Sequence, residues 1–350
     1  MGSSSIESID SQINKIESIL NGIITDNLDK EFLQVDYTLR QQNDESIARG
    51  IDPKVSNEFG PKIGLNVTFI VTAIIFNEQQ EVLMIQEARS ACAGSWYLPA
   101  GRVQPTELLE TAIERAVLAE SGLCFEPISI IKVESSHGNW FRFVYTGRIT
   151  GGQLKTASKA DEQSLQACYV NDVDNLALRS RDCLPLIEFA RDYYRNGQSW
   201  HLPQLICKRY VPNLYLRLVV AVWDQKINKH RVIIAHSLSP HLPICQLNPT
   251  RSVHSTLKRF MQYIFGGNDG ISNSSLVPPH KPVGLIAIEH DIANHSDQYD
   301  GLCLTLLVHC KHPDSPLHNA FTWTTLSNTG ELLLAEKLSS RHKTIAHSVL

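Results

Sequence analysis

The most specific pattern in the chain lies in residues 94–123, which read GSWYLPAGRVQPTELLETAIERAVLAESGL. Gly101 is followed by five residues and then Glu107, and seven more residues lead to Arg115. Val117, Glu120, Gly122 and Leu123 complete the pattern. So many fixed positions at fixed spacing, where a predicted strand passes through a loop into a helical pattern over residues 105–121, do not readily arise by chance.

This pattern resembles the Nudix box, G-x5-E-x7-R-E-U-x-E-E-x-G-U, where U is a bulky aliphatic residue, and residues 96–99 (WYLP) resemble the usual approach to it. From about residue 65 to 194 the chain resembles the Nudix hydrolases that remove phosphate from 8-oxo-guanine nucleoside diphosphates. The segments that carry this likeness are 84–88, 94–102, 140–145, 151–156 and 164–167, and in the C-terminal half 295–308. The resemblance implies an α/β (α+β) fold, a Nudix α/β/α sandwich with a mixed sheet between helices.

The family's chemistry explains why the box needs these residues. A pyrophosphate repels a nucleophilic water, and divalent ions neutralise the charge and acidify the water. Such ions prefer carboxylate and carbonyl oxygens, which the family takes from one helix face and from the first glycine of the box. The resemblance therefore implies Mg²⁺ or Mn²⁺ as cofactor, with Glu120 and the Gly101 carbonyl as metal ligands. Arg115 and Glu107 join Glu120 in the catalytic set, as a structural pair that braces the loop.

The chain departs from the box on its metal-binding face. Positions 116, 119 and 120 share one face at 3.6 residues per turn, and the family places glutamate at all three. Here they are Ala116, Ala119 and Glu120, so two carboxylates are missing. Glu114 projects about 120° away from position 120, and Glu110 projects about 80° away and lies nearly three turns earlier, so neither can simply substitute. Loss of a group that only orients the metal ligands already lowers metal affinity or activity roughly 10–100-fold. We therefore expect a weakened metal site that retains Glu120.

Other side chains are candidates to complete the site. Asp161 and Glu162 lie in the loop where several relatives place an extra catalytic glutamate, and Glu134 is a third candidate acid; all three also suit solvated loop or strand-edge positions. For substrate binding the candidates are Trp96, Leu98 and Phe141, because nucleotide pockets are apolar and lined by aromatic groups. A further cluster, Glu289, His290, Asp291, His295 and Asp297, could bind a metal or simply meet water in a polar turn.

Two functions remain open at this point. The first is metal-dependent hydrolysis of nucleoside diphosphate derivatives by a degenerate box, with an oxidised guanine nucleotide as one candidate substrate. The second is a catalytically impaired Nudix-fold protein that binds a nucleotide or a partner. Family resemblance favours the enzyme, and Ala116 and Ala119 favour the binding protein.

The rest of the chain suggests three regions. Residues 1–62 combine an amphipathic helix, with isoleucine and leucine at 3-4-3-4-3 spacing over residues 6–23, and a polar linker over 27–62; the helix stripe offers helix docking or a homodimer. Residues 63–197 form the Nudix domain. It contains a hairpin of 67–76 with 82–85, strands at 128–135, 140–149 and 168–170, and a helix at 182–194.

Residues 203–340 form a C-terminal α/β domain. Strands are expected at 215–222, 231–235, 283–289, 302–310 and 321–324, with a helix at 252–265. Because this order repeats that of the first half, the domain is interpreted as a degenerate, boxless Nudix-like copy.

Composition limits the alternatives. The 350 residues carry 32 Lys and Arg against 36 Asp and Glu, which argues against a protein that coats nucleic acid. No apolar run is long enough to cross a membrane, and the N-terminus lacks the features of a secretion signal. The eight cysteines form no CxxC pair and are expected to be reduced thiols of an intracellular, cytoplasmic protein. The expected partner is a small-molecule nucleotide.

Overall fold

The computed structural model describes residues 9–21, 31–197, 200–237, 239–266, 277–292, 298–312 and 318–350. The chain divides into two compact units. We call Ile63–Glu134 with Phe141–Leu205 the box unit, and Met1–Lys62 with Ser135–Trp140 and Ile206–Leu350 the companion unit. The segment that resembles the Nudix box lies wholly in the box unit.

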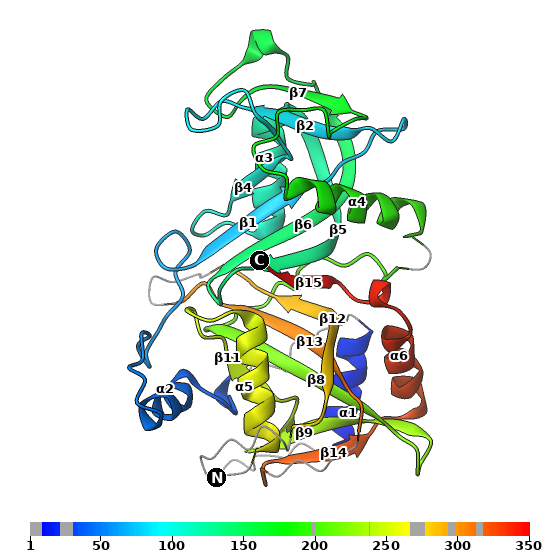
Figure 1. The fold of residues 1–350 in the computed structure, drawn as a ribbon. Helices are drawn as coiled ribbons and strands as arrows, with labels where there is room; N and C mark the ends of the chain where they lie inside the picture. Colours follow the sequence, from blue (N-terminus) through cyan, green and yellow to red (C-terminus); the bar gives the residue numbers. More distant parts are fainter. Residues whose placement is uncertain are drawn as a thin grey trace, which may run out of the picture. The chain divides into compact units, whose positions relative to one another are not determined.

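Two groups of strands build the box unit (Figure 1). In the first, the order is β5 (Leu123–Ser135), β6 (Trp140–Gly152), β1 (Thr68–Ala73) and β4 (Ala100–Arg102). In the second, β2 (Val82–Glu87) lies between β3 (Trp96–Tyr97) and β7 (Ser164–Val170). With the helices α3 (Leu109–Ser121) and α4 (Cys183–Arg195), these strands confirm the predicted α/β (α+β) class.

The hairpin predicted from residues 67–76 and 82–85 forms only near its turn. Asn77 donates its backbone N–H to the carbonyl of Glu81 at 3.0 Å, and Phe76 forms a single bridge with Val82. Beyond this point β1 pairs with β4 and β6, whereas β2 pairs with β3 and β7. The two strands diverge because each satisfies its backbone hydrogen bonds with different partners.

Helix α3 is held by an apolar stripe at helical spacing. Its buried residues include Leu109, Ala112, Ile113, Ala116 and Val117, so one face of the helix packs inside the unit. The helix ends at Gly122, whose φ of +76° lies in the left-handed region that favours glycine. The sequence predicted that this helix begins at residue 105. It begins at Leu109 instead, because the preceding residues form a loop.

The companion unit has its own sheet and helices. Its sheet follows the order β10 (Pro240–His241), β9 (Lys229–His236), β8 (Leu214–Asp224), β13 (Leu302–Cys310) and β12 (His280–Glu289). β11 (Ile244–Gln246) adds to β8, and β14 (Phe321–Thr325) adds to β9. Its α-helices are α1 (Ile9–Leu20), α2 (Leu39–Ala48), α5 (Val253–Phe265) and α6 (Asn328–Ser339), and β15 (Ala346–Val349) is its last strand.

Strand pairing in the companion unit parallels that in the box unit. β8 pairs with β13 and β11 as β1 pairs with β6 and β4, and β9 pairs with β10 and β14 as β2 pairs with β3 and β7. The order along the chain also agrees, because α5 follows β11 as α3 follows β4, and α6 follows β14 as α4 follows β7.

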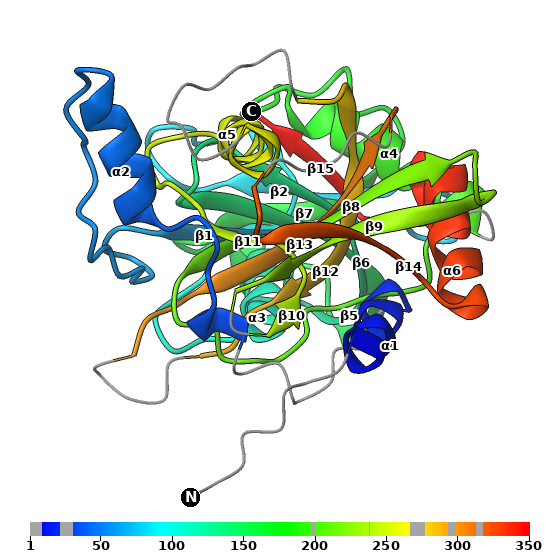
Figure 2. The ribbon, with the colours of Figure 1, turned by 90° about the horizontal axis from the view of Figure 1, so that it is seen from below.

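The N-terminal region packs within the companion unit. In α1, Ile16, Ile19 and Leu20 are buried, and the helix lies beside α6 in both views (Figures 1 and 2). The apolar stripe predicted over residues 6–23 therefore packs against other parts of the same chain. Its two outermost isoleucines lie outside the described residues.

The stretch expected to be a linker, 27–62, contains ordered structure. Helix α2 begins at a capping box in which Thr38 and Gln41 satisfy each other's backbone N–H groups. Phe32 and Tyr37, which precede this helix, are buried. Polar composition concealed these elements because α2 has few apolar residues and is stabilised by its cap and its packing.

Candidate active site

The loop between β4 and α3 is braced by one ion pair. Arg115 donates from Nε to Glu107 Oε1 at 2.6 Å and from Nη2 to Glu107 Oε2 at 2.7 Å. Arg115 Nη2 also donates to the carbonyl of Arg102, and Glu107 accepts the N–H of Gln104. Burial raises the pKa of Glu107, but the Arg115 and Gln104 hydrogen bonds outweigh it and lower that pKa below its ordinary value. The two residues thus join the ends of the loop.

Glu120 lies at the end of this helix beside the first glycine of the box. Its side chain is buried, and its Oε2 accepts the backbone N–H of Ala100 at 2.9 Å. Ala100 precedes Gly101, so the carboxylate is held next to the Gly101 peptide. Burial raises the pKa of Glu120 to about 7, the Ala100 N–H opposes this shift, and the nearby Glu87 adds to it.

The two alanines of the metal-binding face lie in different surroundings. Ala116 is buried, and a Cβ built on Gly101 would lie 2.9 Å from its methyl carbon. Ala119 is half-buried, and its carbonyl accepts a hydrogen bond from Lys155 Nζ at 2.6 Å. Neither position offers an oxygen-bearing side chain, so Glu120 stands without the two box partners.

Glu87, at the end of β2, is a buried acid that the sequence did not single out. It is 1% exposed, and its Oε1 accepts a hydrogen bond from Arg179 Nη1. Its Oε2 is buried and has no hydrogen-bond partner among the residues that the structure describes. Arg89 lies near both acids, with Nε 3.9 Å from Glu87 Oε2 and Nη2 3.9 Å from Glu120 Oε1. The sequence did contain one signal for this residue, because Glu87 ends an apolar strand run. A carboxylate buried at such a position needs a partner.

The additional acids from the sequence are occupied elsewhere or exposed. Glu134 is buried and accepts from Arg142 Nε at 2.7 Å and pairs with Lys132 Nζ at 2.9 Å. Asp161 is exposed and holds Lys155 Nζ at 2.8 and 2.9 Å through its two oxygens. Glu162 is also exposed. Glu134 and Asp161 are thus held by basic side chains, and Glu162 faces solvent.

The three candidates for substrate binding differ in exposure. Leu98 is 1% exposed and Phe141 is fully buried, with its ring edge-on to Phe69. Both therefore pack in the core: Phe141 lies in a stretch of β6 that is buried on both faces, and Leu98 follows directly after β3. Trp96 is half-buried on β3 and retains exposed surface for a ligand. Next to it, the guanidinium carbon of Arg179 lies 3.8 Å from the ring centroid of Tyr97.

The histidine and acid cluster of residues 289–297 is not assembled as a metal site in the described part of the chain. Glu289 is buried and pairs with Arg209 at 2.8 Å and with Arg217, and His290 bonds through Nδ1 to the carbonyl of Gly301 at 2.7 Å. His295 and Asp297 lie outside the described residues. Across the described ranges no group of three or more His, Cys, Asp or Glu side chains could hold a metal ion.

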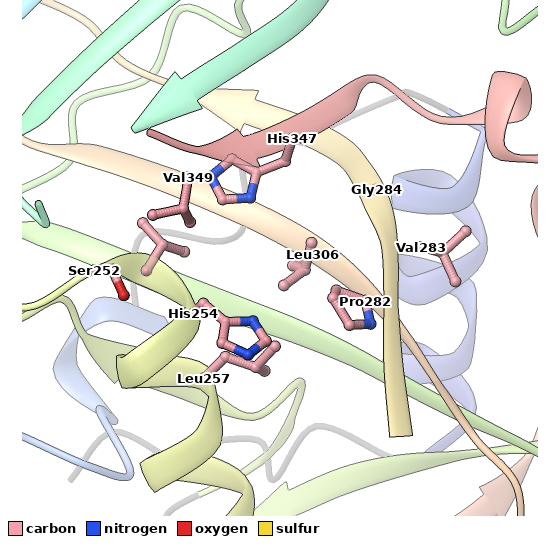
Figure 3. Close-up of a pocket in the computed structure, with 10 residues that line it drawn as sticks. Ser252, His254, Leu257, Pro282, Val283, Gly284, Leu306, His347 and Val349 are labelled. Atoms are coloured by element: carbon pink, nitrogen blue, oxygen red, sulfur yellow. The ribbon is translucent and has the colours of Figure 1, made fainter. Parts of the chain in front are cut away.

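A separate cavity of about 370 Å³ belongs to the companion unit. Figure 3 shows His254 of α5 and His347 of β15 among its lining residues, with Leu257, Pro282 and Leu306. His347 Nε2 is 3.0 Å from Ser135 Oγ. The cavity contains no residue of the box.

All eight cysteines are free thiols. Within the described residues, no helix has the length and apolar character needed to span a membrane.

Comparison with known proteins identifies the family. A model of the NUDIX domain matches residues 68–187. A Mus musculus protein named 8-oxo-dGDP phosphatase NUDT18 is 35% identical over 303 residues, which cover 80% of this chain and 87% of that protein. The Homo sapiens protein of the same name is 37% identical over 257 residues, covering 69% and 72% of the two chains. A solved NUDIX hydrolase from Nitrosomonas europaea is 21% identical with a TM-score of 0.32, covering 39% of this chain and 93% of that one. With the box in place between β4 and α3 and a relative matched over most of its length, this chain belongs to the Nudix hydrolase family.

Proposed function

We propose that the box unit hydrolyses nucleoside diphosphates whose base is 8-oxo-guanine and releases inorganic phosphate, with Mg²⁺ or Mn²⁺ as cofactor. The observation that carries the proposal is the position of Glu120, held beside Gly101 by the N–H of Ala100 at 2.9 Å. The relatives named 8-oxo-dGDP phosphatase support the choice of substrate.

The residues around Glu120 fit a divalent ion. Glu120 and the Gly101 carbonyl supply the oxygen ligands that such ions prefer. Glu120 is a buried residue of helix α3, which holds its carboxylate in position. An ion held there would neutralise charge on the diphosphate and acidify an attacking water. The Glu107–Arg115 pair would keep the loop that carries Gly101 in place while the nucleotide binds. Trp96, with its exposed surface, would contact the base.

The alternative is a protein that binds the nucleotide and turns it over slowly or not at all. Ala116 and Ala119 favour it, because each removes a carboxylate that the family uses. In this alternative the fold is retained for recognition, and fold alone does not establish activity.

We further propose that the companion unit is a Nudix-like copy without a catalytic box. Its matching strand pairings and chain order support this interpretation. Helix α5 takes the place of α3 in this comparison, and both helices span 13 residues. When the two helices are aligned end to end, positions 116, 119 and 120 of α3 correspond to Phe260, Tyr263 and Ile264 of α5. Tyr37 stacks on the rings of Phe260 and Tyr263 at 5.9 and 4.9 Å. No carboxylate stands at these positions, and the catalytic role therefore falls to the box unit.

Phosphate release by the purified full chain tests the proposed function. The substrates are 8-oxo-dGDP, dGDP and the corresponding triphosphates, each with Mg²⁺, with Mn²⁺ and with a chelator. We expect metal-dependent release that is fastest from 8-oxo-dGDP. Equal rates from dGDP and 8-oxo-dGDP would refute the choice of base, and release that persists in the chelator would refute the metal requirement.

A further inference from the structure

The side chains of Glu87 and Glu120 are both buried and both lie near Arg89, although they belong to different elements. Glu87 ends β2 and Glu120 lies near the end of α3, and they are 1% and 4% exposed. One guanidinium group, that of Arg89, lies 3.9 Å from an oxygen of each. Two buried carboxylates that share a neighbourhood are costly unless a cation lies between them.

Each carboxylate has one oxygen fixed by a donor and one directed toward Arg89. For Glu87, Arg179 holds Oε1, whereas no residue in the described part of the chain forms a hydrogen bond with the buried Oε2. For Glu120, the Ala100 N–H holds Oε2, whereas Oε1 has Arg89 at 3.9 Å. The fixed oxygens orient the two groups, and the other pair remains available to a ligand that prefers oxygen.

Arg89 is a weak occupant of this position. Its side chain is 59% exposed, and both of its contacts with the acids are longer than hydrogen bonds. An exposed arginine at such distances contributes little, so it can be displaced at small cost. A divalent cation carries twice the charge and binds carboxylate oxygens directly.

We propose that Glu87 is a second carboxylate ligand of the divalent ion, beside Glu120, and that Arg89 competes with the ion for the same two oxygens. Glu87 then performs part of the task for which Ala116 and Ala119 have no side chain. This inference rests on the proposed metal-dependent function, but it concerns binding of the ion alone.

Direct binding of Mn²⁺ to the full chain, followed by electron paramagnetic resonance without nucleotide, tests this inference. We expect Glu87→Gln to weaken Mn²⁺ affinity at least about tenfold, and Glu120→Gln to weaken it similarly. Arg89→Met should strengthen binding severalfold, because it removes the competing cation and leaves both carboxylates unchanged. The matched control is Glu114→Gln, an exposed acid on the same helix, which should leave affinity unchanged.

The outcomes separate this inference from the proposed function. If Glu87→Gln and Arg89→Met both bind Mn²⁺ as the unaltered chain does, Glu87 is not a ligand, even if phosphate is released. If Glu87→Gln weakens binding but no substrate is hydrolysed, the ligand assignment stands and the enzymatic proposal fails. If Glu87→Gln does not fold, Arg89→Met decides alone, and unchanged affinity in that variant overturns the inference. Absence of Mn²⁺ binding by the unaltered chain overturns the inference, whereas the proposed function is judged by metal-dependent phosphate release.

Discussion

Gly101 and Ala116 meet so closely that a Cβ on the glycine would lie 2.9 Å from the Cβ of the alanine. This contact lets β4 approach α3, and it places the Gly101 peptide beside Glu120. A methyl group at Gly101 would force the strand and the helix apart. We therefore predict that Gly101→Ala lowers the free energy of unfolding by about 1–3 kcal/mol, as measured by urea denaturation.

Gly151 provides the control for this substitution. It lies in β6, and a Cβ built there meets no atom within 4 Å. Gly151→Ala should leave the unfolding midpoint nearly unchanged. Equal losses in the two variants would show that the close approach of β4 and α3 is not what Gly101 provides.

A second prediction concerns the buried ion-pair network behind β3. Arg142 donates to Glu134 at 2.7 Å, to the Tyr97 hydroxyl at 2.8 Å and to Asp182 at 2.7 Å. Arg142→Met would remove this partner from the buried Glu134, which also pairs with Lys132. Breaking such a buried pair costs about 3–5 kcal/mol, so we expect a large fall in the urea midpoint.

Arg148 is the matched control, since it pairs with Glu126 at 2.7 Å but both side chains are largely exposed. Arg148→Met should unfold at the same urea concentration as the unaltered chain, because exposed ion pairs contribute little. If Arg142→Met also unfolded at the urea concentration of the unaltered chain, the ion-pair network would not be needed to stabilise the fold.

A third prediction concerns the missing carboxylates. Ala119 is half-buried on the face that carries Glu120, so a glutamate there has room to reach the same ion. We expect Ala119→Glu to increase metal-dependent phosphate release about tenfold or more, in line with the cost of losing such support. The rate at saturating Mn²⁺ is the measurement.

Leu118→Glu adds the same charge one position earlier, where the side chain is 50% exposed and points about 100° away around the helix. It should not raise the rate. A gain in both variants would point to a general effect of negative charge and not to a restored ligand.

A fourth prediction concerns the N-terminal stretch. Tyr37 is fully buried, stacks on Phe260 and Tyr263, and donates its hydroxyl to Glu45 at 2.8 Å. Tyr37→Ala should destabilise the companion unit by about 3–5 kcal/mol. Ile47→Ala, at a side chain 60% exposed, should have little effect. Limited proteolysis followed by mass spectrometry would read out both, and equal resistance of the two variants would contradict the prediction.

The sequence predicted those parts of the fold that carry strong periodicity. The helix at 252–265 and the strand at 302–310 agree closely with α5 and β13, because α5 buries an apolar stripe at helical spacing and β13 is a nearly continuous buried run. Helix α2 was missed, since it depends on the cap at Thr38 and on tertiary packing. Helix α6 was missed as well, although the Ser327 side chain caps it by accepting the N–H of Gly330.

The candidate site was only partly predictable for a similar reason. Spacing within the box placed Glu107, Arg115 and Glu120, whose relationships lie within one loop and one helix. Glu87 comes from a different strand, and only the fold brings it near Glu120 through Arg89. Phe141 and Leu98 were assigned to substrate because an apolar side chain in the sequence suits a ligand pocket and the core equally well, and the stretch of β6 around Phe141 is buried on both faces.

The most direct test of the central proposal is phosphate release from 8-oxo-dGDP by the full chain and by Glu120→Gln, with nucleotide binding measured on both by calorimetry. We predict metal-dependent release by the unaltered chain, lost in Glu120→Gln while the nucleotide still binds. Release that continues unchanged in Glu120→Gln would contradict the role of that carboxylate, and tight binding without any release by the unaltered chain would contradict hydrolysis itself.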